Sequence, residues 1–191
     1  MLLRTVILCL LSMPLSAFSQ VHSLTLGIDV NSPYGLSEPW FTIRNALLRC
    51  EDFQSVAERP DRKAATAEVV TKNGELPDIA KLQKIISESG AGATLRGVEA
   101  TIEGEVLQND GKWFLRIPGK ELSLKPLTGM VQHERNRPKP PRDEELNAYE
   151  RLLASRPKRV RVTGPLRSER GLSLEVRAFE SEKLNNSQLK L

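Results

Sequence analysis

The spacing of the hydrophobic residues changes several times between residues 24 and 106, and this alternation constrains the fold more than any single motif. Residues 24–30 alternate hydrophobic and polar side chains, which is typical of a strand with one buried face. After a turn-rich loop, hydrophobic residues recur three or four positions apart, which predicts an amphipathic helix with Ser37 as its N-cap. The predicted buried face of this helix comprises Trp40, Ile43, Leu47 and Cys50.

Two strands, a second helix and a further strand follow. The two short strands are predicted to be antiparallel and joined around residues 59–62, with the second strand centred on residues 67–70. The stretch ELPDIAKLQKIISESGAG predicts the second helix, which Gly90 or Gly92 ends. Alternation returns over residues 98–106. The order strand, helix, strand, strand, helix, strand indicates an α+β fold.

The first half of the chain, about residues 23–100, resembles the heavy-metal-associated (HMA) family. The resemblance rests on SLTLGIDV as a first strand, FTIRNALLRCEDFQSV as a helix running into a second strand, and LPDIAKLQKIISESGAGA as the second helix and its turn. It implies a ferredoxin-like βαββαβ domain. The family holds soft metals through a Cys-x-x-Cys after the first strand, but the corresponding loop, NSPYGLSEPW, contains no cysteine. We therefore expect the fold without the family's metal chemistry.

The second half, about residues 98–180, has a different pattern. Asp110-Gly111 predicts the turn of a hairpin, and a third, short strand ends near Pro126. Residues 128–145 are polar and rich in Pro and Arg, which predicts an exposed loop, and a short helix and a second hairpin follow. This order resembles the OB-fold and implies a small five-stranded β-barrel with one helix.

The two ends of the chain carry predictions about export and order. Residues 1–19 combine one arginine, small residues near the end and an apolar run shorter than the about 20 residues that span a bilayer. This pattern predicts a cleaved signal peptide and an exported protein, periplasmic or extracellular; a retained N-terminal anchor is the alternative. Cleavage leaves Cys50 as the one thiol, which excludes an internal disulfide. No later segment is apolar enough to cross a membrane, and residues 181–191 are predicted to be a polar tail.

Four residues have the chemistry of metal ligands, and they are Cys50, His22, His133 and Met130. Cys50 lies on the hydrophobic face of its predicted helix, so packing explains it better than metal binding. His22 and a Gln20 amine would together attract copper(II) or nickel(II), but a disordered N-terminus is the simpler interpretation. Met130 and His133 share a loop that offers no third ligand. We therefore predict no metal site and no cofactor.

Catalytic residues are not predicted. A nucleophile needs a base within hydrogen-bond reach and a group that orients the base, whereas one histidine lies near the N-terminus and the other in a loop rich in Pro and Arg. Glu99, Glu103 and Glu105 alternate along one predicted strand, and a solvent-exposed sheet face explains them. We therefore expect a protein that is not an enzyme.

Two basic clusters lie in the second half. The first comprises Arg135, Arg137, Lys139 and Arg142, and the second comprises Arg156, Lys158, Arg159 and Arg161. Aromatic residues make up 5% of the chain, too few for the stacking platform with which OB-folds bind nucleic acids, and a net charge of +4 is modest. We expect no nucleic-acid partner, although the first cluster would attract an anionic polymer or surface.

These features predict an exported, non-enzymatic binding or scaffolding protein with a degenerate metal-binding-type domain. Its partner is predicted to be an unidentified protein or an anionic surface. The expected contacts are aromatic and basic residues in loop or hairpin positions, namely Tyr34, Trp40, Lys112, Trp113 and Arg116. Two alternatives stay open: a copper or zinc binding or transport protein, and a binder of anionic polymers or surfaces through the basic clusters.

Overall fold

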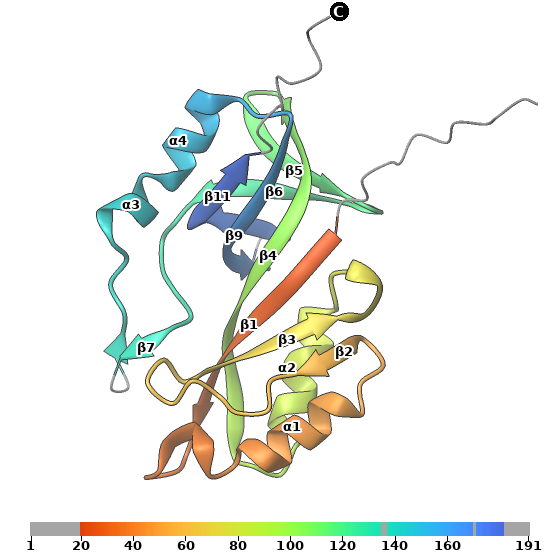
Figure 1. Cartoon of the computed structure of the whole chain (residues 1–191), viewed down its shortest axis with the longest axis vertical. Helices are drawn as coiled ribbons and strands as arrows, with labels where there is room; N and C mark the ends of the chain where they lie inside the picture. The colour runs from red at the N-terminus through yellow and green to blue at the C-terminus, as the bar shows by residue number, and fades with distance from the viewer. Residues whose placement is uncertain (1–19, 135–136, 170, 182–191) are drawn as a thin grey trace, which may run out of the picture.

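The computed structural model describes residues 20–134, 137–169 and 171–181 (Figure 1). The predicted signal peptide, Arg135 and the predicted polar tail from residue 182 onward lie outside the described residues. None of the helices in the described ranges combines the length and the apolar character that a bilayer-spanning helix needs.

The first part of the fold is a four-stranded antiparallel sheet with two helices. In chain order its elements are β1 (Gln20–Val30), α1 (Trp40–Leu48), β2 (Phe53–Val56), β3 (Thr66–Thr71), α2 (Ile79–Ser87) and β4 (Ala93–Asn109), with short 3-10 turns at Gly35–Ser37 and Lys72–Gly74. The strands pair in the order β4–β1–β3–β2. The two helices contact each other, α1 packs against β2, and α2 packs against β4. The predicted order of strands and helices is confirmed.

The start of α1 differs from the prediction. The sequence predicts Ser37 as the N-cap, but α1 begins at Trp40, and Pro39 is the N-cap residue. Ser37 ends a separate 3-10 turn. Proline has no backbone N–H to donate to a carbonyl of the preceding turn, which separates that turn from the helix.

The second part of the fold closes into a five-stranded barrel. Its strands are β4, β5 (Lys112–Ile117), β6 (Lys120–Pro126), β9 (Arg159–Arg167) and β10 (Ser173–Val176). Neighbours in the order β4–β5–β6–β10–β9 are paired, and β9 pairs back onto β4. The closing pair, β6 with β10, is parallel, whereas β9 and β10 are antiparallel. The predicted α+β class is confirmed, and so is a small closed barrel.

Helices and short strands complete the second part. They are β7 (His133–Glu134), β8 (Arg137–Pro138), α3 (Asp143–Leu146), α4 (Ala148–Ser155) and β11 (Ala178–Ser181). β11 pairs with β9, and α4 contacts β6, β10 and β11, so the helix lies along one side of the barrel (Figure 1).

β4 belongs to both parts of the fold. It pairs with β1 over residues 93–103 and with β9 over residues 98–105. The buried hydrophobic side chains of the two parts form one contiguous cluster. The predicted boundary between a domain at 23–100 and a domain at 98–180 falls inside this strand, and the division into two domains stays a prediction.

The segment after β6 begins differently from the exposed loop that the sequence predicts. Leu127 and Val131 are buried, and the Arg96 Nε–H donates to the Val131 carbonyl at 2.8 Å. Gly27 and Gly97 leave room for this contact, because a Cβ added at Gly27 would lie 2.5 Å from the same carbonyl oxygen. The prediction of an exposed loop over residues 128–145 is wrong at Val131, because this hydrophobic residue is isolated among polar ones and shows no period.

Candidate functional site

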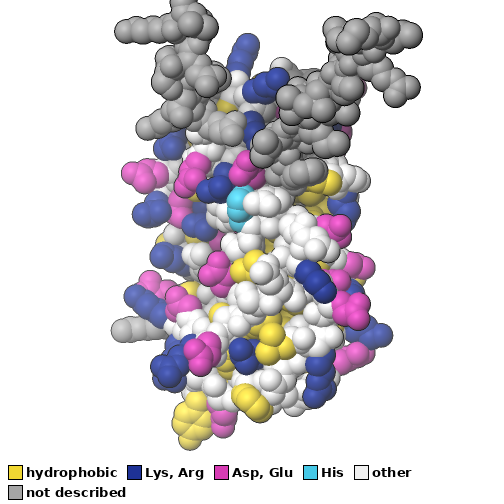
Figure 2. Space-filling view, turned by 45° about the vertical axis from the view of Figure 1, so that its right-hand side comes forward, with side chains coloured by type: hydrophobic (Ala, Val, Ile, Leu, Met, Phe, Trp, Pro, Cys, Tyr) yellow, Lys and Arg dark blue, Asp and Glu magenta, His cyan; other side chains and the backbone are white. Residues whose placement is uncertain are grey.

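A groove lies between the start of α1 and the turn that joins β2 to β3, and its volume is about 740 Å³. We call it the Trp40 groove, and its lining residues are Ser37, Trp40, Phe41, Arg44, Glu58, Arg59, Pro60 and Arg62. Figure 2 shows hydrophobic side chains exposed at the lower end of the molecule, the end at which Figure 1 places α1 and the loop before it.

Trp40 forms the floor of the groove. Its side chain is 4% exposed, and its Nε1–H donates to the Glu58 carbonyl at 3.1 Å. One turn later the Arg44 Nε–H donates to the Ala57 carbonyl at 3.2 Å, so both bonds hold α1 against the chain that leaves β2. Trp40 is buried because it lies on the same helix face as Ile43, as the helical spacing predicts, and its role as a partner contact stays a prediction.

Phe41 is the exposed aromatic residue that the sequence reasoning missed. Its side chain is 72% exposed, because consecutive residues of a helix point about 100° apart and Trp40 already faces the core. The available signal is that Phe41 is a large hydrophobic residue off the predicted buried face. Tyr34, in the loop before α1, is 76% exposed and therefore accessible to a partner.

The groove carries more positive than negative charge. Arg59 and Arg62 are exposed and form no ion pair with any residue that the structure describes. Arg44 bonds to a backbone carbonyl and to no carboxylate within the same described ranges, while Glu58 is the one acidic residue of the described lining. The Ser37 hydroxyl is buried and has no hydrogen-bond partner among the described residues. The groove therefore presents three guanidinium groups beside two aromatic side chains.

The other predicted partner contacts lie on β5, a barrel strand. Lys112 is exposed, and Trp113 is partly buried against the core. Arg116 is exposed, but its Nη2 lies 2.9 Å from Glu121 and its Nη1 lies 3.9 Å from Glu105. These residues are not among the described lining residues of the Trp40 groove. The predicted contacts on β5 therefore lie on a different element from Tyr34, which is in the loop before α1.

The described members of the predicted anion-binding cluster lie in one stretch of the chain, residues 137–142. Arg137 lies in β8 and Lys139 follows it, and both are exposed. Arg142 is the residue that precedes α3, and its Nε lies 3.4 Å from Glu145. The charge of Arg142 is therefore already matched by a carboxylate.

The four residues considered as metal ligands come from three segments of the chain, with Met130 and His133 in the same one. Cys50 is buried and its thiol donates to Asp52 at 3.3 Å. His133, in β7, has Nε2 3.0 Å from Asp29, and Met130 lies three residues before it. Within the described ranges, no three residues among His, Cys, Asp and Glu come together as a metal site.

His22 lies in β1 and not in a disordered terminus. The strand begins at Gln20, and His22 Nε2 lies 3.1 Å from Glu103 on β4. The interpretation as a disordered terminus is wrong, because the pairing of β1 with β4 extends to Gln20.

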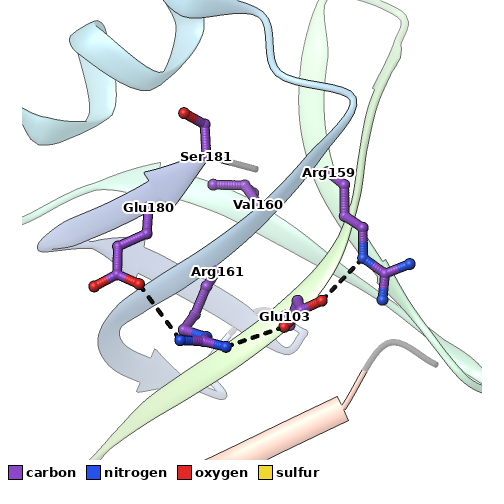
Figure 3. Close-up of a pocket in the computed structure, with 6 residues that line it drawn as sticks. All are labelled: Glu103, Arg159, Val160, Arg161, Glu180 and Ser181. Carbon is purple, nitrogen blue, oxygen red and sulfur yellow. Dashed lines mark hydrogen bonds and ion pairs between the residues drawn. The ribbon is translucent and has the colours of Figure 1, made fainter. Parts of the chain in front are cut away.

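A second pocket, of about 210 Å³, lies on the barrel (Figure 3). Its lining residues are Glu103, Arg159, Val160, Arg161, Glu180 and Ser181. Glu103 lies 3.0 Å from Arg159 Nε and 3.4 Å from Arg161 Nη2, and the other side of Arg161 reaches Glu180 at 3.4 Å. The cations of this pocket are thus paired with carboxylates, so the pocket is less suited to an anion than the Trp40 groove.

Glu103 gives a testable pH dependence. Burial raises its pKa, but hydrogen bonds from His22, Arg159 and Arg161 outweigh burial and hold the pKa below the ordinary value. A lowered pKa stabilises the fold above the unfolded-state value and loses that contribution as the pH falls through the folded-state value. We expect Glu103→Gln to lower the free energy of unfolding by about 1–2 kcal/mol at pH 7. Urea denaturation of both proteins at several pH values should show the difference shrinking below about pH 4.5; a difference that stays constant would contradict the assignment.

Glu99 is buried, which corrects the prediction of a solvent-exposed face for this part of β4. Its side chain accepts from Gln132 at 3.1 Å and lies 3.2 Å from Arg177 Nη2, and Arg177 Nη1 lies 3.3 Å from Glu145. Burial raises the Glu99 pKa more than the Arg177 charge lowers it, whereas Arg142 and Arg177 hold the Glu145 pKa below its ordinary value despite burial. This network joins β4, the segment after β6 and α3, so we assign it a structural role.

No family model matches the chain, and no curated protein or solved structure is significantly similar to it. The geometry of the Trp40 groove therefore carries the functional argument.

Proposed function

We propose that this is an exported, non-enzymatic binding protein whose partner docks in the Trp40 groove. The observation that carries the proposal is the combination, at one concave surface, of arginines without carboxylate partners among the described residues and an exposed phenyl ring above a buried indole. Aromatic residues and arginine are enriched at protein–protein interfaces and dominate their binding energy.

The arrangement of the first part of the fold supports this assignment. A sheet in the order β4–β1–β3–β2 with two helices is consistent with the ferredoxin-like domain that the HMA resemblance implies. In that family the loop after the first strand binds the ligand. Here the same loop runs through residues 31–39 and contributes Ser37 to the groove. We infer that the binding end of the domain is retained and that thiolate chemistry is replaced by guanidinium and aromatic groups.

The barrel is consistent with the OB-like domain expected from the second half. Because the closed barrel shares β4 with the first part, it holds the groove-bearing sheet on a rigid support. We propose that the barrel serves as this support.

Substitution of Phe41 tests the docking site. The bait is the full-length protein, expressed with its predicted signal peptide and recovered from the extracytoplasmic fraction after crosslinking. We expect Phe41→Ser to reduce capture of the wild-type partner at least tenfold, because the phenyl ring lines the groove. Its free energy of unfolding should stay within about 0.5 kcal/mol of the wild-type value, since the ring is exposed.

Leu48→Ser is the matched control, because Leu48 is also an exposed hydrophobic residue of α1 but is not among the described lining residues. Capture should be unchanged in this variant. Undiminished capture by Phe41→Ser would refute the groove as the docking site. Loss of capture only in Arg116→Glu would place the partner on β5 and refute it equally.

A further inference from the structure

We infer that the Trp40 groove binds an acidic, extended segment of a partner protein, with carboxylates on Arg59 and Arg62 and an apolar side chain against Phe41 and Pro60. This inference rests on the proposed function, because it specifies the chemistry of the partner that docks in the same groove.

The charge pattern of the described residues favours a carboxylate ligand. Within the described ranges, seven other arginines have a carboxylate partner within 4.0 Å: Arg96, Arg116, Arg142, Arg159, Arg161, Arg167 and Arg177. Outside the groove, Arg49, Arg137, Arg151 and Arg156 have none among the described residues. Arg59 and Arg62 have none among the described residues, although they lie only three positions apart on one turn. The planar fork of a guanidinium group matches a carboxylate through two parallel hydrogen bonds. The groove therefore offers two such forks without an internal partner.

The apolar part of the groove favours a ligand that carries an apolar side chain among its acidic ones. Trp40, Phe41 and Pro60 contribute carbon surface to a lining that also contains the arginines. An extended peptide that carries acidic residues beside an apolar one satisfies both features.

A protein segment fits this surface better than a small molecule. Small-molecule sites bury most of the ligand surface, whereas Phe41, Arg59 and Arg62 are exposed and leave the groove open. An anionic bilayer fits less well, because the surface is concave and Glu58 lies on its lining, where it would repel lipid phosphates. An extended peptide can enter the concavity and keep its carboxylates away from Glu58.

The test is a titration of the exported protein with a defined peptide. The probe is an acetylated and amidated tetrapeptide of three glutamates and one leucine, compared with the same peptide in which glutamine replaces each glutamate. Trp40 and Trp113 are the two tryptophans of the chain, so Trp113→Phe leaves Trp40 as the fluorescent reporter in the groove. We expect the glutamate peptide to bind at least tenfold more tightly than the glutamine peptide, with an affinity that falls as salt is added.

Charge variants locate the binding. Arg59→Gln combined with Arg62→Gln should abolish the preference for the glutamate peptide. Arg137→Gln combined with Lys139→Gln, which removes the same charge from an exposed segment elsewhere, should leave the preference intact. Both pairs lie on the surface, so circular dichroism should show unchanged folding.

Equal affinity for the two peptides would overturn the inference, and so would an undiminished preference in the Arg59/Arg62 variant. A third result would also overturn it: the protein binds phosphatidylglycerol vesicles more tightly than the peptide, and the binding to vesicles depends on Arg59 and Arg62. If Phe41→Ser loses its natural partner while the peptides bind equally, the docking site stands and the acidic chemistry is wrong. If Phe41→Ser captures the natural partner normally, the proposed function itself fails.

Discussion

Gly164→Ala is expected to lower the free energy of unfolding by about 3 kcal/mol or more, because it inserts a methyl group where the barrel closes. Gly164 lies in β9 opposite Ala100 of β4, and a Cβ added to it would lie 1.7 Å from the carbonyl oxygen of Glu175. That oxygen belongs to the backbone of β10, which pairs with β6 on one side and β9 on the other. The strand cannot move away without opening the barrel.

Urea denaturation followed by circular dichroism measures this loss. Gly129→Ala is the matched control, since the nearest atom to its added Cβ is the end of the Arg167 side chain at 3.2 Å, which has to shift by only a few tenths of an ångström. The control should change the free energy of unfolding by less than about 1 kcal/mol. Similar small effects in both variants would show that β9 and β10 are not held together as described.

Arg177→Leu is expected to lower the free energy of unfolding by about 3–5 kcal/mol at pH 7, because it leaves a buried carboxylate without its positively charged partner. Arg177 lies within 3.3 Å of both Glu99 and Glu145, and the Glu99 side chain is almost fully enclosed. Removing one partner of a buried ion pair leaves the other desolvated and uncompensated. Glu145 keeps a hydrogen bond from the Arg142 backbone N–H at 2.8 Å, so Glu99 should account for most of the loss.

The pH dependence of Arg177→Leu separates lost charge pairing from lost packing. Burial already raises the Glu99 pKa in the native protein, and removing Arg177 raises it further. The Glu99 pKa lies above its ordinary value of 4.5 in the native protein and higher still in the variant, so the deficit of the variant should be largest at neutral pH and should already shrink as the pH falls toward about 4.5. Glu99→Gln combined with Arg177→Leu should be more stable than Arg177→Leu alone at pH 7. A deficit that is independent of pH, with no rescue by Glu99→Gln, would assign the effect to packing.

Both substitutions bear on function through the support of the groove. The groove residues belong to the 3-10 turn before α1, to α1 and to the β2–β3 turn, and these elements are built on the sheet that β4 shares with the barrel. A variant that destabilises the barrel should therefore weaken partner binding only where the protein unfolds. Groove substitutions such as Phe41→Ser should weaken it with the fold intact.

The predicted elements of the first half are confirmed because they depend on local spacing. The alternation at Leu24, Leu26 and Ile28 predicts a strand with one buried face, and all three side chains are fully buried in β1. The second helix is confirmed for the same reason, with Leu82 and Ile86 on its inner face. The parallel pairing of β6 with β10 could not be predicted in this way, because nothing local specifies which distant strand completes a barrel.

The candidate site was only partly accessible to sequence reasoning. The loop before α1 was singled out, and it contributes to the groove. The sequence predicts Trp40 both on the buried face of the helix and as a partner contact, and the structure buries it. Phe41 was missed because it lies off the hydrophobic face that predicts the helix. Arg59 and Arg62 appeared only as a turn, since the sequence does not show which arginines lack a carboxylate neighbour.

The sequence by itself determined the types and order of the strands and helices of the first half, because hydrophobic periodicity is a property of neighbouring residues. Only the tertiary structure decided which side chains are buried with a partner and which are exposed without one. It placed Glu99 beside Arg177 and left Arg59 and Arg62 without a carboxylate among the described residues. The physical reason is that desolvation and ion pairing depend on residues that are distant in the sequence and adjacent only after the chain has folded.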